Sequence, residues 1–291
     1  NNHDENKIAI VIHGGAGIIL KENISKSKED SIINKLDEAI SKGWELLKKG
    51  ESSEIAVIET IKILEDSPLF NAGKGSVFNS EGKVENDASI MKGNDLNAGA
   101  SSGTSNVKNP ITLAANIMNH SEHVFLSGKG AENFAKNRNL EIVNNEYFHT
   151  KFRYNQLLNK KGEDKYGTVG CVAIDVNGNI VAGTSTGGMT NKKWGRIGDS
   201  PIIGAGTYAN NSTCGISSTG SGEYFIRTVA AYQVSSLLEN HNYDLKKAMY
   251  KVIHEKIGGI GGDGGMIGID KNSNISMEFN IHSSTIFKSM N

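Results

Sequence analysis

The segment Gly167-Thr-Val-Gly-Cys-Val-Ala-Ile-Asp-Val-Asn-Gly-Asn-Ile-Val-Ala-Gly-Thr-Ser-Thr186 contains the strongest fold signal in the chain. Two apolar runs, Thr168–Asp175 and Ile180–Thr186, flank the dipeptide Asn177-Gly178. Asn-Gly tolerates positive φ at both central positions of a type I′ turn, which is the turn that joins antiparallel strands tightly. The segment therefore predicts a β-hairpin whose first strand begins at a threonine.

Glycine is concentrated around this hairpin. The chain has 34 glycines in 291 residues, about 12% against a usual ~7%, and 13 of them lie between Gly167 and Gly222. Valine, isoleucine, alanine and threonine are interleaved with them, so the region is not a flexible linker. Glycine at this density within strand-like sequence indicates tight turns and close approach of backbones.

The flanking sequence alternates between helical and strand patterns. Expected helices are Ser27–Lys49, Glu54–Leu64 (capped by Ser53), Ile111–Asn119, Ala131–Asn137, Phe148–Leu158, Glu223–Leu238 and Asp244–Lys256. Further expected strands are Ile8–Ile12, Ser76–Asn79, Val84–Met91, Ala98–Gly103, Met266–Asp270 and Ile275–Phe279. This order fits an α+β protein in which sheets have helices packed outside them. No repeat or linker divides residues 1–291, so we expect one domain.

Composition excludes several classes of function. The 31 basic and 32 acidic side chains give a net charge of −1 without a concentrated basic stretch, so no nucleic-acid partner is expected. No apolar run approaches the ~20 residues that span a bilayer, so no membrane partner is expected. Cys171 and Cys214 are expected to be small buried hydrophobes rather than a disulfide framework. We expect a cytoplasmic protein, with a periplasmic or secreted location left open because the chain begins with Asn1.

Two glycine-rich motifs suggest other chemistry but lack its context. Gly15-Ala16-Gly17 has Leu20 where a dinucleotide-binding fingerprint needs its third glycine, and the segment 73–76 lacks the residue order of a phosphate-binding loop. Gly183-Thr-Ser185-Thr-Gly187 matches a serine-hydrolase elbow, with Asp263 and His282 following. An elbow needs a strand that turns into a helix, whereas this strand belongs to a hairpin. We therefore expect neither a nucleotide site nor a serine triad.

A histidine pair gives a third weak signal. His120 and His123 have spacing that could suit a metal ion, but no cysteine or carboxylate completes a ligand set near them. We expect no catalytic metal.

Thr168 offers a different chemistry. A polar loop at 159–165 leads into Tyr166-Gly167 and then into the strand. If the bond between Gly167 and Thr168 were cleaved, Thr168 would gain a free α-amine with a reference pKa near 7.7–8.0. That amine could remove the proton of the residue's own hydroxyl, so one residue would supply nucleophile and base. The branched Cβ of threonine restricts χ1, and glycine tolerates the strained backbone that self-attack requires.

Several long motifs, in order along nearly the whole chain, resemble the plant-type asparaginases, also called isoaspartyl peptidases. The motifs are Ile12–Gly17, Phe70–Phe78, Asp87–Met91, Val107–Ile111, Tyr166–Gly170, Ser185–Lys192 and Gly195–Ala209. The resemblance implies a four-layer αββα sandwich of the N-terminal-nucleophile hydrolase type. It also implies self-cleavage between Gly167 and Thr168 into residues 1–167 and 168–291. Two such cleaved protomers are expected to associate as an (αβ)2 dimer.

The resemblance further implies a role for each matching residue. Thr168 is expected to be the nucleophile, with Thr186 bonded to it and Asn71 nearby. Arg196 is expected to bind the α-carboxylate of the substrate and Asp199 its α-ammonium, with backbone contacts from Gly222. The alternative for Arg196 and Asp199 is a simple ion pair between residues three apart. The Thr219 hydroxyl and the Gly220 amide are expected to form the oxyanion hole. A structural sodium ion, and no catalytic cofactor, is expected on backbone carbonyls of Leu64, Glu65, Ser67, Phe70, Ala72 and Lys74.

The implied substrates are L-asparagine and β-aspartyl dipeptides. Trp194 replaces a proline common in relatives, and Phe279-Asn280-Ile281-His282 lacks their usual Thr-Glu after Phe-Asn, so the leaving group is less well defined than the aspartyl end. Glycosylasparaginase, a related amidohydrolase that acts on a sugar-bearing substrate, remains an alternative. So does an unprocessed, inactive relative that serves as a binding module.

Overall fold

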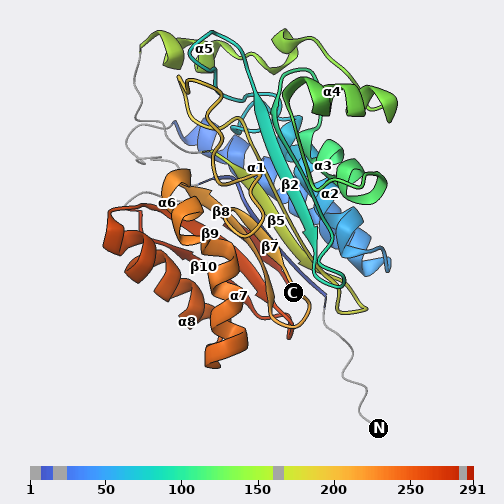
Figure 1. Ribbon diagram of the computed structural model, residues 1–291, viewed down its shortest axis with the longest axis vertical. Coiled ribbons are helices and arrows are strands. Elements are labelled where there is room, and N and C mark those ends of the chain that lie inside the picture. Colours follow the sequence, from blue (N-terminus) through green and yellow to red (C-terminus); the bar gives the residue numbers. More distant parts are fainter. Residues whose placement is uncertain (1–7, 16–24, 160–166, 282–286) are drawn as a thin grey trace.

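The computed structural model describes residues 8–15, 25–159, 167–281 and 287–291, which form two β-sheets with helices packed against them (Figure 1). The larger sheet has the strand order β11 (Phe287–Met290), β1 (Ala9–His13), β5 (Val169–Ile174), β6 (Ile180–Thr186), β2 (Asn86–Lys92), β3 (Ala98–Thr104) and β4 (Phe125–Ser127). The smaller sheet has the order β10 (Ile275–Phe279), β9 (Gly264–Asp270), β8 (Cys214–Gly220) and β7 (Thr207–Ala209). The β3–β4 pair is parallel, and the other pairs among these strands are antiparallel.

The predicted hairpin is confirmed as β5 and β6 at the centre of the larger sheet. Val169 pairs with Ser185 and Ile174 with Ile180. The expected type I′ turn is wrong, because Gly178 has φ +76 but Asn177 has no positive φ. The Gly178 amide donates to the Asp175 carbonyl and Asp175 pairs with Asn179, so the loop has three residues, 176–178. The Asp175 carboxylate accepts hydrogen bonds from the amides of Asn177 and Asn179, which holds the turn closed. This register brings the first residue before β5 beside the last residue of β6.

The larger sheet packs its outer face against α1 (Lys26–Lys48), α2 (Ser53–Glu65) and α3 (Pro110–His120). The buried residues of α1 recur every three or four positions, as expected for one face of an amphipathic helix: Ile32, Leu36, Ala39, Ile40, Gly43 and Leu47. They share a core cluster with Ile10 of β1, Ile61 of α2 and Cys171 of β5. Both cysteines are buried and free, as predicted.

The smaller sheet is covered on its other side by α7 (Ala230–His241) and α8 (Leu245–Tyr250), which Figure 1 shows on the side of the molecule away from α1 and α2. Phe225 of α6 (Gly222–Thr228) joins this second core cluster. A third cluster joins the two sheets to each other, with Val11 and Val172 from the larger sheet and Ile267 and Ile269 from the smaller. The expected class, sheets with helices outside them, is therefore confirmed.

The helix α4 (Gly128–Asn137) contacts β3 near the edge of the larger sheet. The helix α5 (Lys151–Leu158) follows a short 3₁₀ turn at Asn145–Phe148, and its Arg153 donates to the Gly75 carbonyl. The prediction of one helix over Phe148–Leu158 therefore began too early. Among the described residues, no helix is both long enough and apolar enough to cross a bilayer.

Several predicted elements were wrong in detail. Ser76–Asn79 forms an isolated bridge from Phe78 to Val84 instead of a strand. The predicted helix Glu223–Leu238 breaks at Val229, which adopts left-handed φ 50 and ψ 49. Ser52, not Ser53, caps α2, because its hydroxyl accepts the amide of Ile55. The helix predicted to end at Lys256 continues after α8 as a π-helix at Lys251–Ile257.

Candidate active site

Thr168 lies immediately before β5, within hydrogen-bond distance of the last residue of β6. Its Oγ1 donates to Oγ1 of Thr186 at 3.0 Å, and the same oxygen of Thr186 accepts the amide of Gly188 at 3.0 Å. Both threonine side chains are largely buried, Thr168 at 8% exposed and Thr186 at 2%. Thr186 thus draws the hydroxyl proton of Thr168 toward itself and fixes where its lone pairs point.

The peptide bond before Thr168 is held by Asn71. The Asn71 backbone amide donates to the Gly167 carbonyl at 3.0 Å. Its side chain is fixed in turn, because Oδ1 accepts the amide of Val77 and Nδ2 donates to the carbonyl of Gly188. An amide directed at the Gly167 oxygen is placed to stabilise negative charge that would develop there during attack on that carbonyl.

Gly15 packs against the same bond, a contact that the sequence did not reveal. It has φ +104, and a Cβ added there would lie 2.5 Å from the Gly167 Cα. No side chain fits at position 15 without displacing the backbone of Gly167. Its place in the His13-Gly14-Gly15 motif was the available signal, but position in a motif does not reveal a contact across 152 residues of sequence.

An acidic residue on the loop after β6, Asp199, lines the same pocket as Thr168. The Asp199 carboxylate is 4% exposed, and its Oδ2 has no hydrogen-bond partner among the described residues. Burial raises the pKa of Asp199 to about 7, although Arg196 nearby opposes the shift. A Cβ on Gly222 would lie 2.8 Å from Oδ1 of Asp199 and 3.2 Å from Nη2 of Arg196. Glycine at 222 therefore leaves space beside the Asp199 carboxyl group and the Arg196 guanidinium group.

Arg196 already has an anionic partner, Glu223, which the sequence did not identify. Its Nε and Nη2 donate to the two carboxylate oxygens of Glu223 at 2.9 and 3.0 Å. This bidentate pair lowers the pKa of Glu223. The earlier alternative, an ion pair between Arg196 and Asp199, is not the one that forms.

One pocket contains most of the residues that were predicted to be catalytic or to bind the substrate. Its lining comprises Thr168, Thr186, Gly188, Met189, Arg196, Gly198, Asp199, Ser200, Gly220 and Ser221. Thr219 precedes Gly220 at the end of β8 and is 1% exposed. At Gly220 a Cβ would lie 2.5 Å from the carbonyl oxygen of Asp263, so only glycine allows the chain to present this amide beside the pocket.

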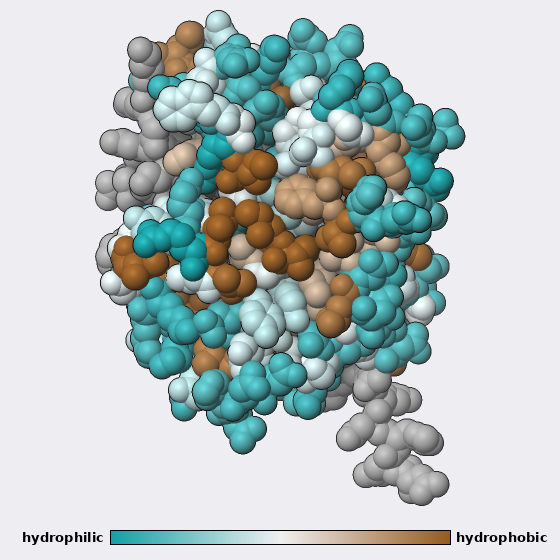
Figure 2. All heavy atoms as spheres, in the orientation of Figure 1, coloured by the Kyte–Doolittle hydropathy of each residue, from teal (hydrophilic) through white to brown (hydrophobic). Residues whose placement is uncertain are grey.

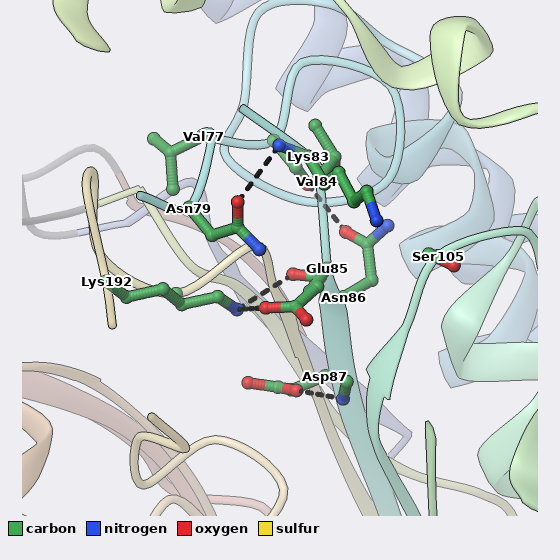
Figure 3. A network of polar contacts seen from close by, with 12 residues as sticks. Val77, Asn79, Lys83, Val84, Glu85, Asn86, Asp87, Ser105 and Lys192 are labelled. Atoms are coloured by element: carbon green, nitrogen blue, oxygen red, sulfur yellow. Dashed lines mark hydrogen bonds and ion pairs between the residues drawn. The ribbon is translucent and has the colours of Figure 1, made fainter. Parts of the chain in front are cut away.

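The loop that carries Arg196 is anchored to the start of β2 by a polar network (Figure 3). The buried Lys192 amine donates to the Glu85 carbonyl at 3.0 Å and lies 3.9 Å from the Glu85 carboxylate. Figure 3 shows the lysine extending toward Glu85, with Asp87 further along the strand. Burial raises the pKa of Asp87, while Lys192 and Arg196 counteract the rise. A loop fixed in this way holds its binding groups in one geometry.

The loop expected to bind sodium has carbonyls that turn toward its own glycines. A Cβ on Gly75 would lie 2.7 Å from the Pro68 oxygen and 2.8 Å from the Phe70 oxygen, and one on Gly73 would lie 2.5 Å from the Glu65 oxygen. The Phe70 and Glu65 oxygens, two of the six expected sodium ligands, therefore lie beside the glycines of the loop, and carbonyl oxygens are donors that a hard cation prefers. The Leu64 and Glu65 oxygens also accept amides of Ser67 and Lys74, each leaving a second lone pair.

Two residues of the serine-hydrolase motif have other partners. Ser185 donates to the buried Glu65 carboxylate, and Asp263 accepts the hydroxyl of Ser221. His282 lies outside the described residues, as do Ala16, Gly17 and Tyr166 of the motifs.

Comparison with known proteins gives a consistent result. A family model described as "Asparaginase" matches residues 6–165 and 158–290. The chain is 45% identical to an isoaspartyl peptidase of Escherichia coli, over 94% of this chain and 90% of the relative. It is 44% identical to a putative isoaspartyl peptidase/L-asparaginase of Dictyostelium discoideum, over 94% and 91%. A plant-type L-asparaginase of Pyrococcus horikoshii is 46% identical over 77% of each chain. The chain belongs to the asparaginase family.

Proposed function

We propose that the protein is an amidohydrolase, an isoaspartyl peptidase and L-asparaginase, that uses Thr168 to cleave β-aspartyl amide bonds. The observation that carries the proposal is that the Thr168 hydroxyl lines one pocket together with the Asp199 carboxyl group and the Arg196 guanidinium group. Arg196 and Asp199 match the α-carboxylate and α-ammonium that every β-aspartyl substrate presents. The names of the relatives describe the same two activities.

Maturation precedes catalysis in this proposal. Thr168 Oγ1 attacks the carbonyl carbon of Gly167, and the Asn71 amide stabilises the oxyanion. The C–N bond breaks as the acyl group moves to oxygen, and the nitrogen takes up a proton to become the α-amine of Thr168. Water then hydrolyses the ester, which releases the Gly167 carboxylate and restores the hydroxyl. The products are residues 1–167 and 168–291 of a single domain.

Hydrolysis repeats the attack on an external carbonyl. The neutral α-amine of Thr168 accepts the hydroxyl proton as Oγ1 attacks the substrate side-chain carbonyl. The Thr219 hydroxyl and Gly220 amide stabilise the oxyanion. The amine of Thr168 then returns the proton to the leaving nitrogen, so ammonia or an α-amino compound departs and an aspartyl ester remains. Water cleaves this ester, yielding aspartate and free Thr168.

The fold and assembly belong to the same proposal. Two sheets packed face to face with helices outside support a four-layer αββα sandwich of the N-terminal-nucleophile hydrolase type. A sodium ion held by the carbonyls of Leu64, Glu65, Ser67, Phe70, Ala72 and Lys74 would stiffen the loop that carries Asn71. Figure 2 shows apolar residues gathered on one face of the molecule, a surface that association into an (αβ)2 dimer could bury. The cytoplasmic location remains a prediction.

A denaturing gel and three substrates test the proposal. Cleavage gives two fragments of about 18 and 13 kDa from the 31.2 kDa chain. The cleaved protein should hydrolyse β-Asp-Leu and asparagine, and should release little aspartate from GlcNAc-asparagine. Preference for GlcNAc-asparagine would instead support glycosylasparaginase. A single uncleaved band after prolonged incubation, without hydrolysis, would support the inactive binding module.

A further inference from the structure

A chain of buried hydrogen bonds runs from the carbonyl of Thr168 into the space between the two sheets. His13 Nδ1 lies 3.1 Å from the Thr168 oxygen, and His13 Nε2 lies 3.1 Å from Ser217 Oγ. The chain continues through Thr184 Oγ1, 2.7 Å from Ser217, and Thr207 Oγ1, 2.6 Å from Thr184. It ends at Ser89, whose hydroxyl lies 2.8 Å from Thr207 Oγ1. All five side chains are 0% exposed.

The Thr168 carbonyl at one end of this chain determines which group donates and which accepts in each hydrogen bond. The Thr168 carbonyl can only accept a hydrogen bond, so Nδ1 of His13 must carry hydrogen. Burial lowers the pKa of His13 to about 3, so the ring is neutral near pH 7 and Nε2 accepts from Ser217. Each hydroxyl then donates once, in the order Thr207 to Thr184 to Ser217 to His13.

The backbone is shaped to admit this contact. A Cβ at Gly170, which pairs with His13 across β1 and β5, would collide with Ser217 Oγ and with His13 Nε2. Glycine there opens the larger sheet so that a side chain of the smaller sheet reaches the imidazole. The hydrogen bond between Ser217 and His13 therefore requires glycine at position 170.

We propose that His13 is a positioning residue for the nucleophile, acting through its hydrogen bond to the Thr168 carbonyl, a role that rests on the proposed function. That carbonyl lies just outside β5, which begins at Val169. After self-cleavage Thr168 loses its covalent tether on the amino side. Holding the plane of its carbonyl group then limits rotation about Cα–C, which sets where the amine and Oγ1 point. An error of ~1 Å in such placement can cost ~10²-fold in rate.

Two variants at the same position separate positioning from stability. In His13→Asn the amide nitrogen can occupy the place of Nδ1 and keep the bond to Thr168, whereas in His13→Gln the amide can reach only the place of Nε2, beside Ser217. Both remove the ring, so both should lower Tm. We expect H13N to retain kcat for β-Asp-Leu within about 3-fold and H13Q to lose about 10- to 100-fold, with KM little changed in either. The extent of self-cleavage should rank the same way.

A control variant for the loss of a buried hydroxyl contact is available at the end of β8 opposite to Gly220. Thr213 and Ser235 are 2.6 Å apart and buried, so Ser235→Ala should lower Tm and leave kcat unchanged. Equal losses of kcat in H13N and H13Q, or no loss in either, would overturn the inference. If wild-type protein cleaves itself but hydrolyses no β-aspartyl substrate, the proposed function fails instead. Should both variants misfold, nitrogen NMR of wild-type His13 decides: hydrogen on Nδ1 supports the inference, and hydrogen on Nε2 overturns it.

Discussion

Thr168, immediately before β5, and Thr186, at the end of β6, have uncharged side chains, whereas Arg196 and Asp199 lie on a loop and have a basic and an acidic side chain. In the strand half of the pocket, the hydroxyls bond to one another and to Gly188. In the loop half, one oxygen of Asp199 has no partner among the described residues, and Arg196 is paired with a side chain that is 52% exposed.

This difference separates two tasks. A group that reacts benefits from being fixed before the substrate arrives, because no reorganisation is then needed during the reaction. A group that binds benefits from keeping a site open, because a buried carboxylate without a partner gains most when a cationic ligand supplies one. Changes in the strand half should therefore affect kcat, and changes in the loop half should affect KM.

The largest effect is expected for Thr168→Ala. Removal of the hydroxyl eliminates the attacking atom for both self-cleavage and hydrolysis, so the gel should show one band and turnover should fall by about 10⁴-fold or more. Thr168→Ser is the matched control, because it keeps Oγ and loses the methyl group that restricts χ1. Serine should still cleave and turn over, more slowly. Substantial hydrolysis by the alanine variant would show that another residue is the nucleophile.

Thr186→Val tests whether the strand half acts on kcat. Valine keeps the branched shape but cannot accept the Thr168 hydroxyl. We expect kcat for β-Asp-Leu to fall about 10²-fold, as for other single hydrogen bonds in acyl-transfer sites, with KM nearly unchanged. Steady-state kinetics on cleaved protein measure both constants. A rise in KM at constant kcat would remove the distinction between the two halves.

The two halves also differ in how far they could be predicted from sequence. The hairpin itself could be predicted from local sequence, but a two-residue turn at Asn177-Gly178 would have placed Thr168 opposite Gly187. The three-residue loop that forms shifts the register by one residue and places Thr168 beside Thr186. Resemblance to the family placed Arg196 and Asp199 in the site, yet pattern alone left them as a possible ion pair. Glu223 is next to Gly222 in sequence, but its contact with Arg196 spans 27 residues and depends on how the loop after β6 packs against α6.

The fold shows the same limit. Long periodic helices such as α1 were predicted within one residue of their ends, whereas β8 was missed because Cys214–Gly220 contains small and polar residues in place of an apolar run. Ser217 of this strand belongs to the buried hydrogen-bond chain that includes His13 and Thr184, so tertiary contacts, rather than strand propensity, define the strand.

Asp199→Asn tests the loop half and carries a pH signature. Because the pKa of Asp199 is raised to about 7, the carboxylate becomes protonated as pH falls through that value and can no longer pair with the substrate ammonium. In wild type, protonation of Asp199 should therefore contribute a decrease in kcat/KM for asparagine of about tenfold per unit below pH 7, in addition to the decrease caused by protonation of the Thr168 amine. The Asp199→Asn variant should have a KM roughly 10- to 100-fold higher than wild type. Its kcat/KM should lose the contribution of Asp199 to the acidic limb, leaving only the titration of the Thr168 amine. An unaltered acidic limb in the variant would assign the dependence to another group.

Glu223→Gln should give the smallest effect, and its sign is informative. Glu223 occupies Nε and Nη2 of Arg196, so an incoming α-carboxylate must compete for the same donors. Glu223 also raises the pKa of Asp199 through its charge. Glutamine removes the competing charge while keeping the side-chain length, so KM for asparagine should fall. Because the pair is half exposed, the fall should be no more than about 5-fold, and the acidic limb of kcat/KM should move to lower pH. An increase in KM would mean that Glu223 holds Arg196 ready for the substrate, and the loop half would then be preorganised in the same way as the strand half.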